Sequence, residues 1–125
     1  MRVVGIGLDA VDVGRMRMIL ARTPSFAERV FTADELAYAR TAKDPAQRLA
    51  VRFAAKEAVL KVLGLGLGAC AFTEIEVVRA ESGAPSIGLY GAAAELAAAA
   101  EVAHWQISLT HTDTIAMAVA IGTTT

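Results

Sequence analysis

The sequence has 125 residues, a net charge of −1 and one cysteine. The near balance of charges argues against a general nucleic-acid binder, and a single cysteine, Cys70, excludes an internal disulfide and a cysteine-cluster metal site. Hydrophobic residues make up 55% of the chain, so an oligomer is favoured over a compact Ala-rich monomer. No apolar run is long enough to span a membrane, and the first residues lack a signal-peptide layout. We therefore expect a cytoplasmic protein with no membrane partner.

The first third of the chain has clear start signals for local structure. Residues 1–8 form an apolar run of strand length, and their alternation places Asp9, at the strand's end, on the face opposite the apolar set. Asp12 is a suitable N-cap for a helix over residues 13–22. The segment Thr32-Ala-Asp-Glu35 fits a capping box that opens a second helix.

The rest of the chain reads as one long helix followed by strands. Asp44-Pro45 predicts the start of a third helix that runs to about residue 63 and ends at a glycine-rich loop, residues 64–68. After it we expect strands at 74–79 and 85–89, an Ala-rich helix at 91–103, and a closing hairpin of strands at 105–109 and 115–121. Helices segregated from mainly antiparallel strands predict a single α+β domain over residues 1–125.

A carboxylate lies on an apolar face of the long helix. Glu57 shares that face with Phe53 and Leu60, and a buried charge needs a partner. One interpretation is an ion pair with Lys61, four residues later. The other is a metal site that Glu57 shares with Asp9. Two carboxylates suit magnesium, which keeps water ligands and takes further oxygens from a substrate phosphate.

Four cations on the same helix point to phosphate chemistry, although they also fit a solvated helix face. They are Arg48, Arg52, Lys56 and Lys61.

The glycines and a histidine add weaker signals. Gly64, Gly66 and Gly68 would let backbone amides approach a phosphate or nucleotide, but a flexible helix exit explains them equally well. His111, at the expected end of a hairpin strand, could donate to a phosphate oxygen or transfer a proton, or could be a plain turn residue.

The first helix carries a mixed basic and apolar stripe. Arg15, Met18, Ile19 and Arg22 follow the spacing of one helix face. An exposed face of this kind suits docking of an acidic, amphipathic partner helix. The alternative is that Met18 and Ile19 pack in the core while the arginines face solvent.

Three motifs together are more specific than any one of them. Gly5-Ile-Gly-Leu-Asp9, Arg52-Phe-Ala-Ala-Lys-Glu57 and Ile107-Ser-Leu-Thr-His111 closely resemble the holo-acyl-carrier-protein synthases, the small stand-alone members of the phosphopantetheinyl transferase superfamily. The resemblance spans nearly the whole chain. Two positions depart from it: Ala84 stands where many members have Lys or Arg, and Gln106 stands where many have His.

The resemblance implies a small phosphopantetheinyl transferase fold that assembles as a homotrimer, with active sites between protomers that bind coenzyme A and Mg²⁺. By motif match, Asp9 and Glu57 would hold the metal, and Lys56 and Lys61 would face the phosphates. The remaining implied contacts are the nucleotide end of the coenzyme for Arg48, Arg52 and Gly64 to Gly68, the neighbouring protomer's side of the coenzyme for His111 and Thr112, and the carrier protein for Arg15 and Arg22.

The implied reaction transfers 4′-phosphopantetheine from coenzyme A to a serine of an apo-acyl carrier protein and releases adenosine 3′,5′-bisphosphate. The acceptor of the serine proton stays open between a water oriented by Glu57 and His111. So does the carrier, which could serve fatty-acid or polyketide synthesis. A non-catalytic coenzyme A or nucleotide-binding oligomer is the alternative function.

Overall fold

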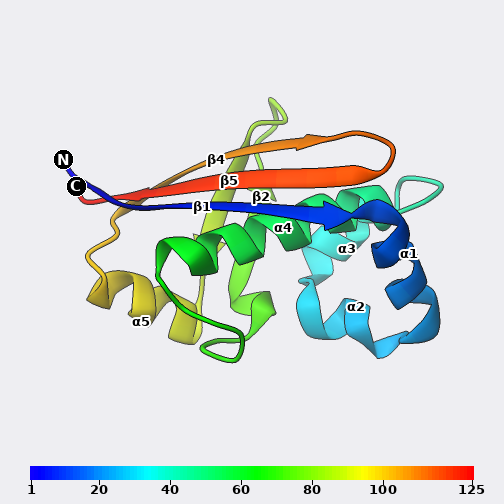
Figure 1. Cartoon of the computed structure of the whole chain (residues 1–125), viewed down its shortest axis with the longest axis horizontal. Coiled ribbons are helices and arrows are strands. Elements are labelled where there is room, and N and C mark those ends of the chain that lie inside the picture. The colour runs from blue at the N-terminus through cyan, green and yellow to red at the C-terminus, as the bar shows by residue number, and fades with distance from the viewer.

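The computed structural model describes all 125 residues. They form two antiparallel sheets, as the α+β expectation requires. The three-stranded sheet has the order β1 (Val3–Asp12), β5 (Ile115–Thr123), β4 (His104–His111), and the two-stranded sheet pairs β2 (Ile75–Arg79) with β3 (Pro85–Leu89). Val3 pairs with Thr123, so the two chain ends lie side by side (Figure 1).

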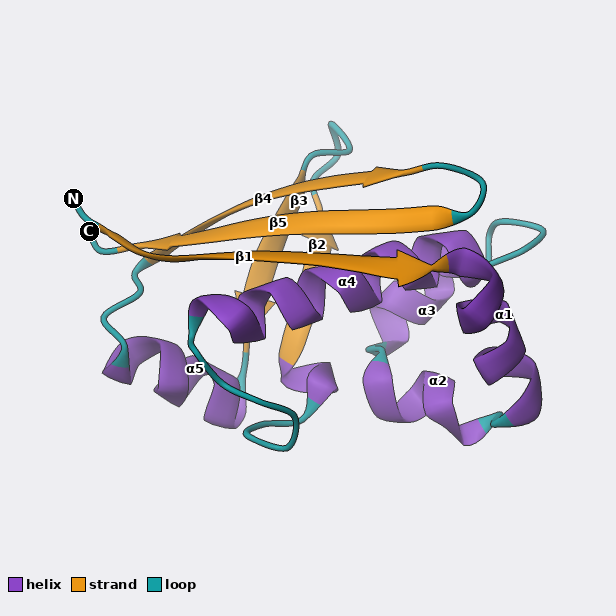
Figure 2. Cartoon of the chain, in the orientation of Figure 1, coloured by secondary structure: helices purple, strands orange, loops and turns teal.

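The helices lie on one side of the three-stranded sheet. In chain order they are α1 (Val13–Arg22), α2 (Ser25–Val30), α3 (Ala33–Ala39), α4 (Ala46–Val62) and α5 (Gly91–Ala99), with a short 3₁₀ turn at Phe72–Glu74. α4 runs along the sheet, α1 to α3 gather at one end of it and α5 lies at the other, while the β2–β3 hairpin crosses behind (Figures 1 and 2). No helix is both long and apolar enough to cross a bilayer.

Two glycines bring β1 against α4. A Cβ atom on Gly7 would lie 1.9 Å from the Ala58 carbonyl oxygen, and one on Gly5 would lie 2.8 Å from that of Val62. Because larger residues cannot fit at this distance, glycine at both positions lets the strand lie directly on the helix. Asp9 lies on the same face of β1 as these glycines, opposite Ile6 and Leu8 as the alternation predicts. The structure adds that this is the face that α4 covers.

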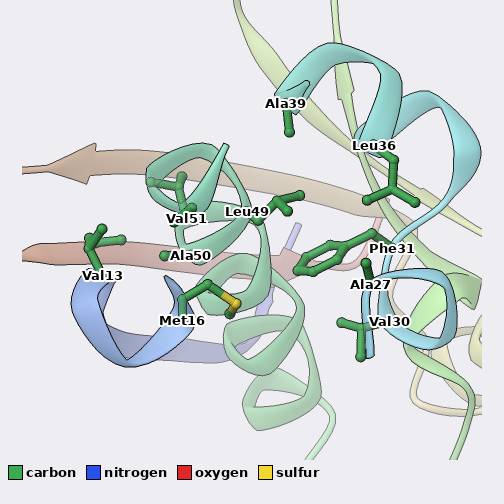
Figure 3. Close-up of a cluster of buried hydrophobic side chains, with 12 residues drawn as sticks. Val13, Met16, Ala27, Val30, Phe31, Leu36, Ala39, Leu49, Ala50 and Val51 are labelled. Carbon is green, nitrogen blue, oxygen red and sulfur yellow. The ribbon is translucent and has the colours of Figure 1, made fainter. Parts of the chain in front are cut away.

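The apolar core has two parts, one on each side of the middle of α4. The first packs α4 against α1, α2 and α3, where Met16, Phe31 and Leu49 are almost completely buried (Figure 3). The second packs the later turns of α4 against the sheet and the β2–β3 hairpin, around Val59 and Ile75. α4 is therefore enclosed along most of its length. Both clusters hold the helix that carries Glu57 and the four predicted phosphate-facing cations.

Several local predictions are confirmed. Asp12 caps α1 by accepting a hydrogen bond from the Arg15 amide at 2.8 Å. Thr32 and Glu35 form the complete capping box of α3. Asp44 accepts from the Ala46 amide at 3.0 Å at the start of α4, as the Asp-Pro signal predicts.

Two element boundaries were wrong, and one helix was missed. β1 does not end at Leu8 but continues to Asp12, because its pairing with β5 extends from Val3 to Asp12, and Asp9 lies opposite Ala118 within the strand. α2 was not predicted, since it has only six residues and no side-chain cap. α5 ends at Ala99, and Glu101 adopts a positive φ of 64° that a helix cannot contain.

Candidate active site

The two predicted metal ligands line one pocket. Asp9, from β1, and Glu57, from α4, open onto a cavity of about 630 Å³, here called the acidic pocket. Asp12 and Arg15 line its rim, and its walls are mostly apolar, from the residues Ala10, Val11, Met16, Ile19, Phe26, Phe53 and Ile115. Residues 48 positions apart in the chain thus converge because β1 lies directly on α4.

Lys61 joins the same group of charges. Its ammonium donates to the Leu8 carbonyl at 2.6 Å and to Asp9 Oδ1 at 3.1 Å. The predicted alternative, an ion pair between Lys61 and Glu57, is not formed, because Lys61 reaches across to β1 instead. Glu57 consequently has no ion-pair partner of its own.

The pKa of Glu57 is raised above its ordinary value. Burial is the main cause, the negative charge of Asp9 acts in the same direction, and the Lys61 ammonium opposes both. A carboxylate whose ionised form is destabilised by its surroundings is typical of a site that is completed by a positive ligand.

The donor set at this point fits magnesium. Asp9 and Glu57 face one pocket, whereas Asp12, the third acid in its lining, caps α1 by accepting from the Arg15 amide. No three histidine, cysteine or acidic side chains form a cluster. Such a site would take the remaining oxygens of an octahedral ion from water and from a bound phosphate, which is the usual arrangement for magnesium.

Other predicted residues surround a second cavity of about 510 Å³, here called the basic pocket. Arg48 and Arg52 of α4 and His111 at the end of β4 line it. The nearby Thr112 carbonyl accepts from Gln47 Nε2 at 3.1 Å, which ties the β4–β5 turn to α4. Arg48, Arg52 and His111 thus belong to one pocket of one chain. The implied contact of His111 with the coenzyme from the neighbouring protomer stays a prediction.

Two residues of the basic pocket were missed by the sequence analysis. Tyr38 of α3 and Arg79 of β2 line it together with Arg52. Neither lies in a motif, and no local pattern links α3, α4 and β2, so only the tertiary fold brings these side chains together.

Lys56 lies in the interior, away from both pockets, and its expected contact with the phosphates stays a prediction. Its side chain is 0% exposed and pairs with the equally buried Glu35 at 2.8 Å. The ammonium also donates to the carbonyls of Phe72, at 3.0 Å, and Ile75. Glu35 in turn accepts from the Val77 amide at 2.9 Å. Lys56 therefore connects α4 to α3 and β2 and lines neither pocket.

The glycine loop follows α4 and remains open. Gly64 and Gly68 have positive φ values of 68° and 91°, and a Cβ atom on Gly64, Gly66 or Gly68 would meet nothing within 4 Å. The conformation, not close packing, requires glycine at Gly64 and Gly68. The loop lines neither pocket of the isolated chain.

The stripe on α1 faces outward beside the acidic pocket. Arg15 and Ile19 line that pocket, Met18 is 49% exposed and Arg22 is exposed. The core methionine of α1 is Met16 instead. The alternative in which Met18 packs in the core is therefore wrong.

Known proteins are similar to this chain in sequence and fold. A model described as the 4′-phosphopantetheinyl transferase superfamily matches residues 5–120. The holo-[acyl-carrier-protein] synthase of Frankia casuarinae is 47% identical over 99% of this chain and 100% of its own length.

Solved structures are also similar to this chain in sequence and fold. The acyl carrier protein synthase of Plasmodium yoelii with ADP bound is 30% identical, with a TM-score of 0.91 over 99% of this chain and 97% of that one. The Helicobacter pylori holo-[acyl-carrier-protein] synthase in complex with coenzyme A is 28% identical, with a TM-score of 0.83 over 94% and 99%. The resemblance carried by the three motifs is confirmed, and the chain belongs to the holo-[acyl-carrier-protein] synthases of the 4′-phosphopantetheinyl transferase superfamily.

Proposed function

We propose that this chain transfers 4′-phosphopantetheine from coenzyme A to a serine of an apo-acyl carrier protein and releases adenosine 3′,5′-bisphosphate. Its relatives at 38–47% identity are named holo-[acyl-carrier-protein] synthase. The observation that carries the proposal is the convergence of Asp9 and Glu57 on one pocket, with Lys61 beside them. This arrangement supports phosphoryl transfer, in which positioning and charge neutralisation dominate catalysis.

The residues of the acidic pocket would divide the work. Magnesium held by Asp9 and Glu57 would offset the negative charge of the pyrophosphate. Lys61 would stabilise the leaving phosphate. The serine oxygen forms a bond to the phosphorus nearer the pantetheine, and the bond from that phosphorus to the bridging oxygen breaks, so the bisphosphate leaves with the electron pair. Glu57, through a water, and His111 are the two candidates for receiving the serine proton.

The proposed assembly is a homotrimer with active sites between protomers. Each protomer is a single domain of residues 1–125. The acidic and basic pockets share no lining residue, and Arg52 and Glu57 project from different faces of α4. A coenzyme A that used both pockets of one chain would have to pass around the helix. At an interface between protomers, the acidic pocket of one can meet the basic pocket of the other, with the glycine loop at the same interface. One coenzyme A could then reach both pockets without passing around the helix.

The uncovered face of the three-stranded sheet supports this assembly. Ile6 and Leu8 are 65% and 55% exposed, and Met117 of the central strand β5 lies on the same face, opposite Ala10 of β1. No helix covers this side of the sheet in Figure 1. The apolar surface lies over β1 and β5 and is bordered by Ser108 and Thr110 of β4. An exposed apolar patch with a polar border is typical of a protein–protein interface.

A charge on this face should dissociate the assembly. We expect Leu8→Lys to give a monomer by size-exclusion chromatography with light scattering, because a lysine buried in an apolar interface is left unpaired. Ala37→Lys, an exposed position on α3, is the control and should leave the mass unchanged. A Leu8→Lys protein with the wild-type mass would contradict the interface.

Mass spectrometry tests the transfer itself. Apo-acyl carrier protein incubated with coenzyme A, magnesium and this protein should gain the mass of one phosphopantetheine group on a serine. Carriers of fatty-acid and polyketide synthesis are to be compared in parallel. Failure to modify any of them would overturn the proposed activity and favour the alternative of a non-catalytic coenzyme A-binding oligomer.

Carrier docking on α1 is best tested at Arg22, because Arg15 also lines the acidic pocket. Arg22→Ala should raise the KM for the carrier protein by up to about fivefold, since an exposed intermolecular charge pair contributes up to about 1 kcal/mol, and should leave the KM for coenzyme A unchanged. Arg17→Ala is the matched control, because Arg17 is already paired with Asp44 at 2.8 Å. Equal changes in both KM values would contradict the docking role of Arg22.

A further inference from the structure

The acidic pocket contains its own cation. The Lys61 ammonium donates to Asp9 Oδ1 at 3.1 Å, whereas Glu57, on the preceding turn of α4, forms no ion pair. Asp9 and Glu57 both line the pocket, and Asp12 and Arg15 at its rim add one charge of each sign. When these groups are ionised, Lys61 therefore offsets one of the two inner carboxylates and leaves the pocket with a single excess negative charge.

Lys61 is anchored to the strand independently of Asp9. Its ammonium donates to the Leu8 carbonyl at 2.6 Å, which is the shorter of its two hydrogen bonds. This is possible because β1 is an edge strand of its sheet and presents carbonyl groups that face away from β5. An ammonium has three hydrogen atoms to donate, and the Lys61 side chain is 50% exposed. Lys61 can therefore release Asp9, keep Leu8 and pair with another anion.

The ammonium disfavours a divalent cation at the same carboxylate. Two carboxylates are a small ligand set for magnesium, which gives up its water ligands reluctantly. A cation bound by Asp9 would share that carboxylate with Lys61, and two positive charges at one carboxylate repel each other. The acidic pocket is thus a weak metal site as long as Lys61 pairs with Asp9.

The pyrophosphate of coenzyme A would change this balance of charges. It carries a negative charge on each phosphorus and so brings more negative charge into the pocket than Lys61 can offset. Its oxygens can pair with a metal and with a lysine at the same time, since lysine binds phosphate as a point charge. Pairing of Lys61 with the pyrophosphate would leave Asp9 Oδ1 to the metal.

We propose that Lys61 is an internal competitor for the metal at Asp9 and that the coenzyme pyrophosphate draws it away, so that magnesium and coenzyme A bind cooperatively. This inference rests on the proposed function. By thermodynamic linkage, the factor by which coenzyme A raises the metal affinity equals the factor by which the metal raises the coenzyme affinity. One ammonium thus neutralises Asp9 before the substrate binds and the pyrophosphate afterwards.

The first measurement needs neither coenzyme nor carrier. Mn²⁺, which prefers the same oxygen ligands as Mg²⁺, is titrated into the protein, and the free ion is followed by its electron paramagnetic resonance signal. We expect Lys61→Met to bind Mn²⁺ about tenfold more tightly than the wild type, because a positive charge beside Asp9 is removed. Lys61→Arg keeps the charge and should bind Mn²⁺ as the wild type does. Lys43→Met, at an exposed lysine without an ion pair, is the control and should also match the wild type.

The second measurement repeats the titrations with coenzyme A present, corrected for the Mn²⁺ that coenzyme A binds by itself. Coenzyme A should tighten Mn²⁺ binding by a larger factor in the wild type and in Lys61→Arg than in Lys61→Met. Two results would overturn the role of Lys61: a Lys61→Met protein that binds Mn²⁺ no more tightly than the wild type, or one in which the coenzyme has as large an effect as in the wild type.

Modification of the carrier protein tests the proposed function separately. If the wild type modifies a carrier, either of the two contrary Mn²⁺ results removes only the role of Lys61 and leaves the proposed function standing. If the wild type modifies no carrier, the proposed function is overturned, and the coenzyme-linked part of this inference with it.

Discussion

Replacing Glu57 with glutamine is expected to slow phosphopantetheine transfer by roughly 100- to 1,000-fold, because a bound metal contributes several kcal/mol to stabilising the charges of the reaction. Glutamine keeps the size of the side chain but not the anionic oxygen that faces Asp9 across the acidic pocket. The measurement is the initial rate of holo-carrier formation at saturating magnesium and coenzyme A. Glu95→Gln, at an exposed position on α5, is the control and should transfer at the wild-type rate.

The same variant should fold as well as the wild type. Because the folded state raises the pKa of Glu57, the native protein holds its proton more tightly than the unfolded chain does. Stability contributed by this group is therefore present below the unfolded pKa and is lost as the pH rises through the folded pKa. Glutamine cannot ionise, so urea unfolding at neutral pH should give an equal or higher free energy of unfolding for Glu57→Gln.

Near-normal turnover by Glu57→Gln in magnesium would contradict the activity prediction and would show that Glu57 does not hold the metal.

The elements that the sequence predicted well are those whose signals are local. Asp12 and Thr32 cap helices through hydrogen bonds to residues three positions away, so one short segment of sequence contains both the donor and the acceptor. The two acids of the acidic pocket were also identified as candidates, because Glu57 stands out on an apolar helix face and Asp9 follows an alternating strand. Their convergence needed the family resemblance, since the pattern alone favoured an ion pair between Glu57 and Lys61.

The environment of α4 was not predictable from its own residues. Its basic side chains looked like a solvated face, but the helix is enclosed by the sheet on one side and by α3 and β2 on another. Arg52 and Lys56 therefore lie in the interior, although they occupy ordinary helix positions. The partner of Lys56 is Glu35, which the sequence identified only as a cap residue. Which charges meet inside a protein is set by contacts between distant elements, and local patterns in the sequence do not reveal those contacts.

Lys56→Ala is expected to lower the free energy of unfolding by about 3–5 kcal/mol, the usual cost of breaking a buried ion pair by removing one partner. Glu35 would be left in the interior without a cation, and the carbonyls of Phe72 and Ile75 would lose their donor. Lys61→Ala is the matched control on the same helix. Its ammonium is 50% exposed where it pairs with Asp9, so the loss should stay below about 1 kcal/mol. Urea unfolding of the two variants gives the comparison.

A double variant then decides whether Lys56 acts through the fold or on the substrate. Glu35→Gln combined with Lys56→Met removes both buried charges and keeps the side-chain volume, so part of the lost stability should return. If Lys56 only holds α4 against α3 and β2, the double variant should have the wild-type KM for coenzyme A, because Glu57, at the next position of the helix, is held in place. A double variant that is stable but still has a raised KM would show that the ammonium contacts the coenzyme phosphates, and would require Lys56 to leave Glu35 when the substrate binds.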